Sequence, residues 1–244
     1  REIDIDNDYI LSRQDAGANF TTSQPSPGEF LENYEELISK GYEKIFVILI
    51  SKNLSGTFQS ANLAKNMLSE PSKVYIFDTM LAAYGTEMIT EQVIKMVDDN
   101  KTEEEIIERI NKIISTSGLM FTVENLFSLV KGGRISNTSA AIGTVLRIKP
   151  IVKMINGKLA VVNKQRTYKR VHKYMVDNVL EDSKGYKNIT FRITSHNSTD
   201  SAKELEHIIT DMFPNSNITF TDYLGPVFSI HIGKKGYGIS WFAE

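Results

Sequence analysis

Cysteine is absent from the 244 residues of this chain, which excludes disulfide bonds, thiolate metal ligands and a thiol nucleophile. No apolar run approaches the roughly 20 residues that a membrane-spanning helix needs, so we expect no transmembrane segment. The formal net charge of −2 and the isoelectric point of about 6.2 lack the basic excess of a nucleic-acid-binding protein. No secretory leader is visible, and the sequence predicts a cytoplasmic protein.

The short motifs of common enzyme and metal sites are also lacking. The sequence contains no H-E-x-x-H, no G-x-S-x-G and no carboxylate cluster with the spacing of a metal-binding loop. Asp78 is the one isolated acid at a predicted strand end, and a single acid does not make an active site. We therefore expect no catalytic residue, no metal and no cofactor.

Composition and periodicity indicate a globular α/β fold. Hydrophobic residues make up 41% of the chain and charged residues 24%, which excludes wholesale disorder. The length suits two modest domains or one large one. A change in composition at Ser115–Gly118 predicts two domains, with a boundary between residues 1–115 and 116–244. Strands alternate with helices in the first domain, which predicts a mainly parallel sheet flanked by helices, and the second domain is predicted to hold a mixed sheet.

In the first domain the expected strands are 44–50 and 74–77, and the expected helices are 54–68, 81–98 and 102–114. The near-continuous apolar run 44–50 predicts a strand that is buried on both faces. Thr102 and Glu105 have capping-box spacing. The helix 54–68 offers a buried stripe that consists of Phe58, Ala61, Leu63, Ala64 and Met67.

In the second domain the expected strands are 119–123, 148–155, 158–162, 188–194, 217–221 and 238–242, and the expected helices are 124–131, 140–146, 166–180 and 201–213. Asn156–Gly157 lies between two apolar runs and predicts a β-hairpin. His172 and His207 lie in charged helical stretches, so we expect both to be solvated. His196 ends a strand, and we expect it to cap a turn.

A hydroxyl-rich loop precedes the helix that runs through Phe30. Ser26, Pro27 and Glu29 have the spacing of a capped helix N-terminus, which is the favoured explanation of the segment taken alone. Thr22 and Ser23 are not needed for that cap. This surplus of hydroxyl groups indicates a ligand role.

Ser55, Gly56 and Thr57 lie in the turn between the first strand and its helix. Ligands of open α/β sheets bind outside the carboxyl ends of the strands, and the free amides at a helix N-terminus suit an anion. The segment lacks the Gly-Lys-Ser/Thr ending of a Walker loop. A structural turn and an anion site explain it equally well.

Two further segments carry one basic side chain each. Arg134 follows Gly132–Gly133, and it is either a surface residue after a helix stop or an arginine held to meet a carboxylate or phosphate. His231 follows an apolar run, interpreted as a strand, and lies among several glycines. A structural histidine is the commoner case, although the glycines indicate a backbone that another group approaches closely.

In this order, the segments together resemble the DegV family of bacterial fatty-acid-binding proteins. The matching segments are Thr22–Ser26, Leu54–Ala61, Asp78–Thr79, Gly132–Ser136, Ile148–Ile151, Leu224–Val227 and His231–Gly233. The resemblance implies two α/β domains with a long-chain fatty acid (C14–C18) between them. It also implies that Thr22 and Ser55 bind the carboxylate, supported by Ser23, Gly56, Thr57, Arg134 and His231.

Family members of the FakB type present the fatty acid to a separate kinase, FakA, which makes an acyl phosphate from ATP. The resemblance therefore implies a carrier that is not an enzyme and that has a FakA-type partner. Two features depart from the family pattern. The family opens with a strand and an Asp-Ser loop, and this sequence begins after both, so we expect the first domain to lack its opening strand. Gly233–Gly236 replaces the family's G-P-G and adds Lys234 and Lys235, for which solvation is favoured over docking of an acidic partner.

Two other classes of function stay open. The turn at Ser55 could serve an enzyme that acts on a small anionic substrate such as a phosphoester, and this hypothesis predicts turnover by the chain alone. A purely structural interaction protein predicts that Thr22→Ala and Ser55→Ala change only stability.

Overall fold

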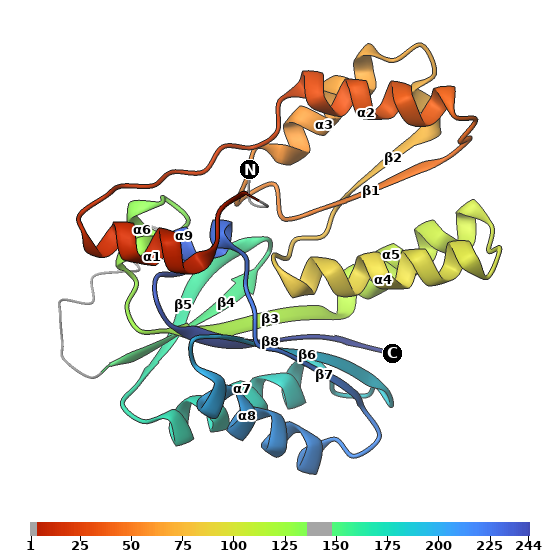
Figure 1. Cartoon of the computed structure of the whole chain (residues 1–244). Helices are drawn as coiled ribbons and strands as arrows, with labels where there is room; N and C mark the ends of the chain where they lie inside the picture. Colours follow the sequence, from red (N-terminus) through yellow and green to blue (C-terminus); the bar gives the residue numbers. More distant parts are fainter. Residues whose placement is uncertain (1–3, 136–147) are drawn as a thin grey trace.

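The computed structural model of the chain describes residues 4–135 and 148–244 (Figure 1). The helix expected at 140–146 and Ser136 lie outside these ranges. The described helices are α1 (Asn7–Asp15), α2 (Pro27–Ser39), α3 (Thr57–Met67), α4 (Tyr84–Asp98), α5 (Glu103–Thr116), α6 (Phe127–Lys131), α7 (Tyr168–Asp182), α8 (Thr199–Met212) and α9 (Pro226–Ile232), with a 3₁₀ turn η2 (Pro71–Lys73). The described strands are β1 (Ile45–Leu49), β2 (Val74–Asp78), β3 (Ser117–Val123), β4 (Lys149–Ile155), β5 (Lys158–Gln165), β6 (Ile189–His196), β7 (Asn217–Thr221) and β8 (Gly236–Ala243).

The strands form one small sheet and one large sheet. β1 and β2 pair in parallel, and the six-stranded sheet has the order β5-β4-β3-β8-β6-β7. In the large sheet only the pair β6–β7 is parallel within the described chain, and the other pairs are antiparallel. The expected α/β class, with one parallel and one mixed sheet, is confirmed. The domain boundary between residues 115 and 116 stays a prediction.

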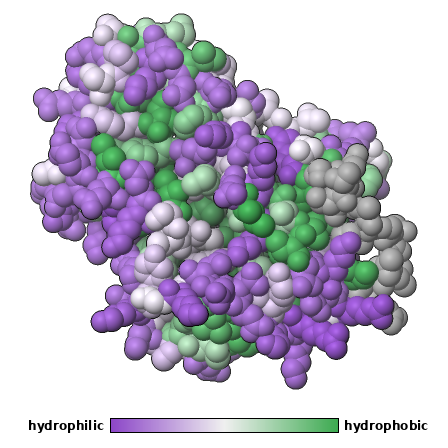
Figure 2. Space-filling model, turned by 180° about the vertical axis from the view of Figure 1, so that it is seen from behind, coloured by the Kyte–Doolittle hydropathy of each residue, from purple (hydrophilic) through white to green (hydrophobic). Residues whose placement is uncertain are grey.

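The elements stack in five layers, as Figure 1 shows. Helices α2 and α3 cover the outer face of the small sheet, α4 and α5 lie between the two sheets, and α7 and α8 cover the far face of the large sheet. Three apolar clusters fill the space between the layers, and the middle cluster contacts both sheets. The outer cluster includes Tyr34 and Ala64, the middle one Ile89 and Ile110, and the far one Phe191. Apolar surface also gathers across the middle of the rear face, between two mostly hydrophilic parts (Figure 2).

The local signals for helix ends and turns are confirmed. Both capping boxes are present, Ser26 with Glu29 at α2 and Thr102 with Glu105 at α5. Asn156 (φ +50°) and Gly157 (φ +75°) form the two-residue turn between β4 and β5. Positive φ at both central residues is what the twist of a tight hairpin requires.

Three predictions about burial are wrong. Within β1 only Ile45 is fully buried. Apolar clusters pack on both faces of the strand, but a sheet of two strands leaves an open edge on each strand, so the other residues are half-buried. In α3, Ala61 and Ala64 are buried, whereas Leu63 and Met67 are 55% and 63% exposed. Leu63 is two residues from Ala61, which places it on the opposite side of an α-helix.

The third wrong prediction concerns His172, which is 2% exposed and not solvated. Its helix, α7, packs onto the large sheet, and the hydroxyl of Tyr237 lies 2.9 Å from His172 Nε2. Burial lowers the pKa of His172 and raises that of Tyr237. His207 is exposed on α8, as expected.

Candidate ligand-binding site

A cavity of about 670 Å³ lies between the two sheets. Its walls come from the segment before α2, the β1–α3 and β2–α4 loops, the turn after α6, helix α9 and the inner face of the large sheet. Apolar side chains cover most of its surface, among them Ile50, Leu54, Leu119, Phe121, Leu159 and Phe228. The volume lies within the usual range of about 300–1,000 Å³ for a small-molecule site.

Five of the polar side chains that line the cavity form what we call the polar cluster, which we define as Thr22, Ser55, Thr57, Arg134 and His231. The sequence predicted each of these residues as part of the site, and Ser23 also lines the cavity. The structure therefore brings side chains from four separate segments to one cavity. Their assignment to a carboxylate stays a prediction.

Thr22 and His231 contact each other directly. Thr22 Oγ1 lies 2.8 Å from His231 Nε2. When Nε2 carries the proton, the imidazole donates to Thr22 and the threonine hydroxyl hydrogen is free to bind another acceptor. His231 Nδ1 is buried and has no hydrogen-bond partner among the described residues. Desolvation lowers the pKa of His231, and the nearby charge of Arg134 lowers it further.

Helix α9, rather than the strand expected from the sequence, carries His231 in its last turn. Pro226 occupies its first turn, where the missing N–H leaves no helix hydrogen bond unmade. The glycine turn after α6 makes room for this histidine. A Cβ on Gly132 would lie 2.6 Å from His231 Nδ1, well inside van der Waals contact. The backbone therefore approaches the ring in a way that only glycine permits.

Arg134 joins that turn to the β1–α3 loop. Its Nε donates to the carbonyl of Leu54 at 3.1 Å, and its Nη1 donates to the carbonyl of Gly132 at 2.6 Å. Gly133, with φ +73°, ends α6 and lets the chain turn back. These bonds fix the guanidinium next to Leu54, the residue that precedes Ser55, and the arginine also lines the cavity.

Ser55 lies in a tight turn just before α3. Its Oγ accepts a hydrogen bond from the backbone N–H of Thr57 at 3.2 Å and lies 2.8 Å from the Thr57 hydroxyl. Gly56 lets the preceding loop cross closely, since a Cβ there would lie 2.5 Å from Nε2 of Gln24. Gln24 therefore packs the segment of Thr22 against the turn of Ser55.

Several cavity residues were not predicted from the sequence. Tyr84, Thr194, His196 and Ser240 line the wall away from the predicted loops. His196 does not cap its own turn as expected, because Nε2 donates to the carbonyl of Gly233 at 3.1 Å. Thr194 and His196 lie at the carboxyl end of β6. Because ligands of α/β sheets bind at the carboxyl ends of strands, this position in the sequence could have identified both residues.

The remaining motif residues have structural partners. Asp78 Oδ1 accepts from the backbone N–H of Met80 at 2.9 Å, and its other oxygen lies 3.5 Å from Lys52 Nζ. Lys234 pairs with Asp15. Over residues 4–135 and 148–244 no cluster of acidic or histidine side chains suits a metal ion. No helix in the same ranges is long and apolar enough to cross a membrane.

The fold and the cavity define a class of protein, in which two sheets with their helices enclose a mainly apolar space that also carries a polar cluster. The chain belongs to the DegV family, since the model of the family described as "Uncharacterised protein, DegV family" matches residues 1–244. A DegV domain-containing protein of Staphylococcus aureus is 32% identical over 221 residues, which are 91% of this chain and 76% of the relative. A DegV domain-containing protein of Clostridium acetobutylicum is 31% identical over 247 residues, which are 100% of this chain and 86% of the relative.

Solved structures of the family are similar throughout. A fatty-acid-binding DegV family protein from Thermus thermophilus has a TM-score of 0.88 at 26% identity, over 98% of this chain and 85% of that chain. DegV of Bacillus subtilis, a fatty acid binding protein, has a TM-score of 0.82 at 25% identity, over 98% and 85%. A Ruminococcus gnavus member, in a structure with vaccenic acid, has a TM-score of 0.81 at 25% identity, over 97% and 84%. The family resemblance is confirmed.

Proposed function

We propose that this protein binds a long-chain fatty acid (C14–C18) in the cavity, with the carboxylate on the hydroxyls of Thr22 and Ser55. Ser23, Gly56, Thr57, Arg134 and His231 support that head group on this proposal. The observation that carries it is that six of these residues line one mainly apolar cavity, namely Thr22, Ser23, Ser55, Thr57, Arg134 and His231. The fatty acids bound by structural relatives support the same ligand class.

The polar cluster has the chemistry that a buried carboxylate needs. An isolated carboxylate is costly to transfer out of water, and donors or a positive charge must offset that cost. Thr22 and Ser55 can donate through their hydroxyls, and Arg134 contributes a full positive charge that lines the cavity. Glu29 also lines the cavity, and its carboxylate accepts from the backbone N–H and the hydroxyl of Ser26 at the start of α2.

The apolar wall supplies most of the binding free energy. Burial of a methylene stabilises by about 0.8 kcal/mol, so about 15 methylenes contribute about 12 kcal/mol before the costs of association. Those costs amount to about 4–15 kcal/mol, so tight binding requires a cavity that already exists, as this one does. The tail then provides affinity and the polar cluster provides orientation.

Native mass spectrometry of the purified protein tests the proposal. We expect an added mass of one C14–C18 acid, and its loss in the double variant Thr22→Ala/Ser55→Ala. Ser39→Ala, an exposed hydroxyl on α2, is the control and should keep the acid. A protein that carries no acid and fails to take up palmitate or oleate would overturn the proposal.

We further propose that the protein is a cytoplasmic carrier that presents its acid to a separate, ATP-dependent kinase of the FakA type. Ser55 Oγ contacts Thr57 and has no general base beside it in the described part of the chain, which supports a carrier rather than an enzyme. Acyl phosphate should form only when kinase, ATP and loaded protein are all present. Turnover of a phosphoester by the chain alone would favour the enzyme hypothesis instead.

A further inference from the structure

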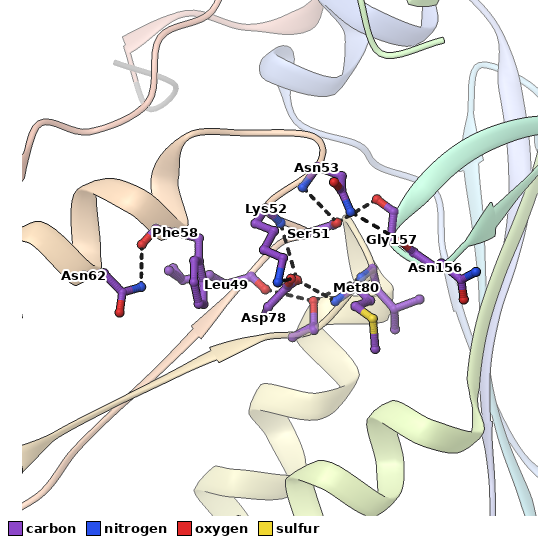
Figure 3. Close-up of polar contacts among 12 residues, drawn as sticks. Leu49, Ser51, Lys52, Asn53, Phe58, Asn62, Asp78, Met80, Asn156 and Gly157 are labelled. Carbon is purple, nitrogen blue, oxygen red and sulfur yellow. Dashed lines mark hydrogen bonds and ion pairs between the residues drawn. The ribbon is translucent and has the colours of Figure 1, made fainter. Parts of the chain in front are cut away.

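The tip of the β4–β5 hairpin reaches from the large sheet to the β1–α3 loop of the small sheet (Figure 3). Ser51 Oγ donates to the carbonyl of Gly157 at 2.7 Å, and Asn53 Nδ2 donates to the carbonyl of Asn156 at 3.3 Å. Ser51 is fully buried. We call these four residues, Ser51, Asn53, Asn156 and Gly157, the hairpin clasp.

Ser51 also organises the loop that leads to Ser55. Its Oγ accepts from the backbone N–H of Asn53 at 3.2 Å. The backbone carbonyl of Ser51 accepts from the N–H groups of Leu54 at 2.9 Å and Ser55 at 3.3 Å. The backbone N–H of Ser51 donates to the carbonyl of Leu81 at 2.8 Å. A shift of Ser51 would therefore move the turn in which the Ser55 hydroxyl lies.

Gly157 allows the contact to be this close. A Cβ at this position would lie 2.7 Å from Ser51 Oγ and 2.9 Å from Asn53 Nδ2. Both neighbours belong to the hairpin clasp, and Ser51 is buried, so it has no free space to retreat into. The φ of +75° at Gly157 adds a backbone preference for glycine.

We propose that Ser51 and Gly157 are positioning residues for the carboxylate site, and that the hairpin tip sets where the Ser55 hydroxyl stands in the cavity. This inference rests on the proposed function, because it assigns the hairpin clasp a role in binding the same carboxylate. Thermodynamic linkage makes the coupling reciprocal. A carboxylate bound at Ser55 therefore holds the hairpin tip more firmly onto the loop.

The test compares palmitate with 1-hexadecanol, which has the same tail and no charge, by calorimetric titration of delipidated protein. The variants are Gly157→Ala and Ser51→Ala. The matched control is Gly185→Ala, which has φ +90° and nothing within 4 Å of its Cβ position, so it carries the backbone penalty without a contact. Circular dichroism checks that each variant folds, and Ser51→Ala decides the test if Gly157→Ala does not fold.

We expect both clasp variants to weaken palmitate binding by about 10-fold, the effect of losing one hydrogen bond to a charged group. Binding of 1-hexadecanol should change less than palmitate binding, and Gly185→Ala should bind both like the wild type. Equal effects on acid and alcohol, or equal effects of Gly157→Ala and Gly185→Ala, would overturn the positioning role. Two other results would contradict the proposed function itself. They are a wild-type protein that binds neither ligand, or a Ser55→Ala variant that binds palmitate normally.

Discussion

At the scale of single residues, the site depends on glycines that leave space for polar side chains of distant segments. Gly132 makes room for the ring of His231, Gly56 for the amide of Gln24, and Gly157 for the hydroxyl of Ser51. In each case a Cβ would stand 2.5–2.7 Å from a polar atom. The sequence showed these glycines, but the side chains that they accommodate become visible only in the fold.

Gly132→Ala should therefore weaken fatty acid binding. The added methyl group displaces the imidazole of His231 and breaks its contact with Thr22. We expect the dissociation constant for palmitate to rise about 10-fold in a fluorescence displacement assay. Gly28→Ala, whose Cβ would meet only Ser26 Oγ at 3.8 Å, is the control and should bind normally. Unchanged affinity in Gly132→Ala would contradict the role given to His231.

His172 makes stability depend on pH. Burial lowers its pKa from the ordinary value of 6.5, so below about pH 6.5 the unfolded chain binds a proton that the folded chain does not. The stability due to the neutral ring is complete above that value and is lost as the pH falls through the folded-state pKa. The ligand-free wild type should therefore lose unfolding free energy between about pH 7 and about pH 5.

The variant His172→Gln isolates this contribution in urea titrations at the two pH values. We expect its unfolding free energy to fall less than that of the wild type over the same interval. His207→Gln, at an exposed position of α8, should retain the full wild-type loss. An identical loss in His172→Gln would show that another group causes the pH dependence.

At the scale of elements, the sequence predicted the helix starts and the hairpin turn, because residues next to each other in the chain determine them. Ser26 and Thr102 mark helix starts because their hydroxyls accept from backbone N–H groups three residues ahead, and Asn156–Gly157 marks a hairpin because both residues adopt positive φ. The prediction failed at 226–232, where a short apolar run fits a strand or a helix equally well. That segment is α9, which begins at Pro226.

The capping box of α5 should contribute measurably to stability. Thr102→Ala leaves the N–H of Glu105 without its hydroxyl partner at 3.3 Å. We expect a loss of about 1 kcal/mol in the free energy of urea unfolding. Thr210→Ala, a helix position whose hydroxyl bonds the Glu206 carbonyl in its own helix, should change it by less than about 0.5 kcal/mol. Equal losses in both variants would mean that the cap stabilises no more than an ordinary helix hydroxyl does.

At the scale of the whole molecule, the layers and the cavity come from contacts between residues far apart in sequence. The order β5-β4-β3-β8-β6-β7 brings β8 between β3 and β6, and periodicity carries no information about such an order. The sequence predicted Thr22, Ser55, Arg134 and His231 as site residues through the resemblance of their segments to a family. It did not predict the opposite wall at Thr194 and Ser240, or the hairpin tip that meets Ser51.

The central claim is that a fatty acid carboxylate binds at the polar cluster. Carbon NMR of palmitate labelled at the carboxyl carbon tests it directly, because the label reports on the head group alone. We expect one bound carboxyl resonance distinct from that of free palmitate. In Thr22→Ala/Ser55→Ala at saturating palmitate it should shift, whereas the exposed control Ser39→Ala/Thr210→Ala should leave it in place. A bound resonance that is identical in the wild type and in Thr22→Ala/Ser55→Ala would contradict the account.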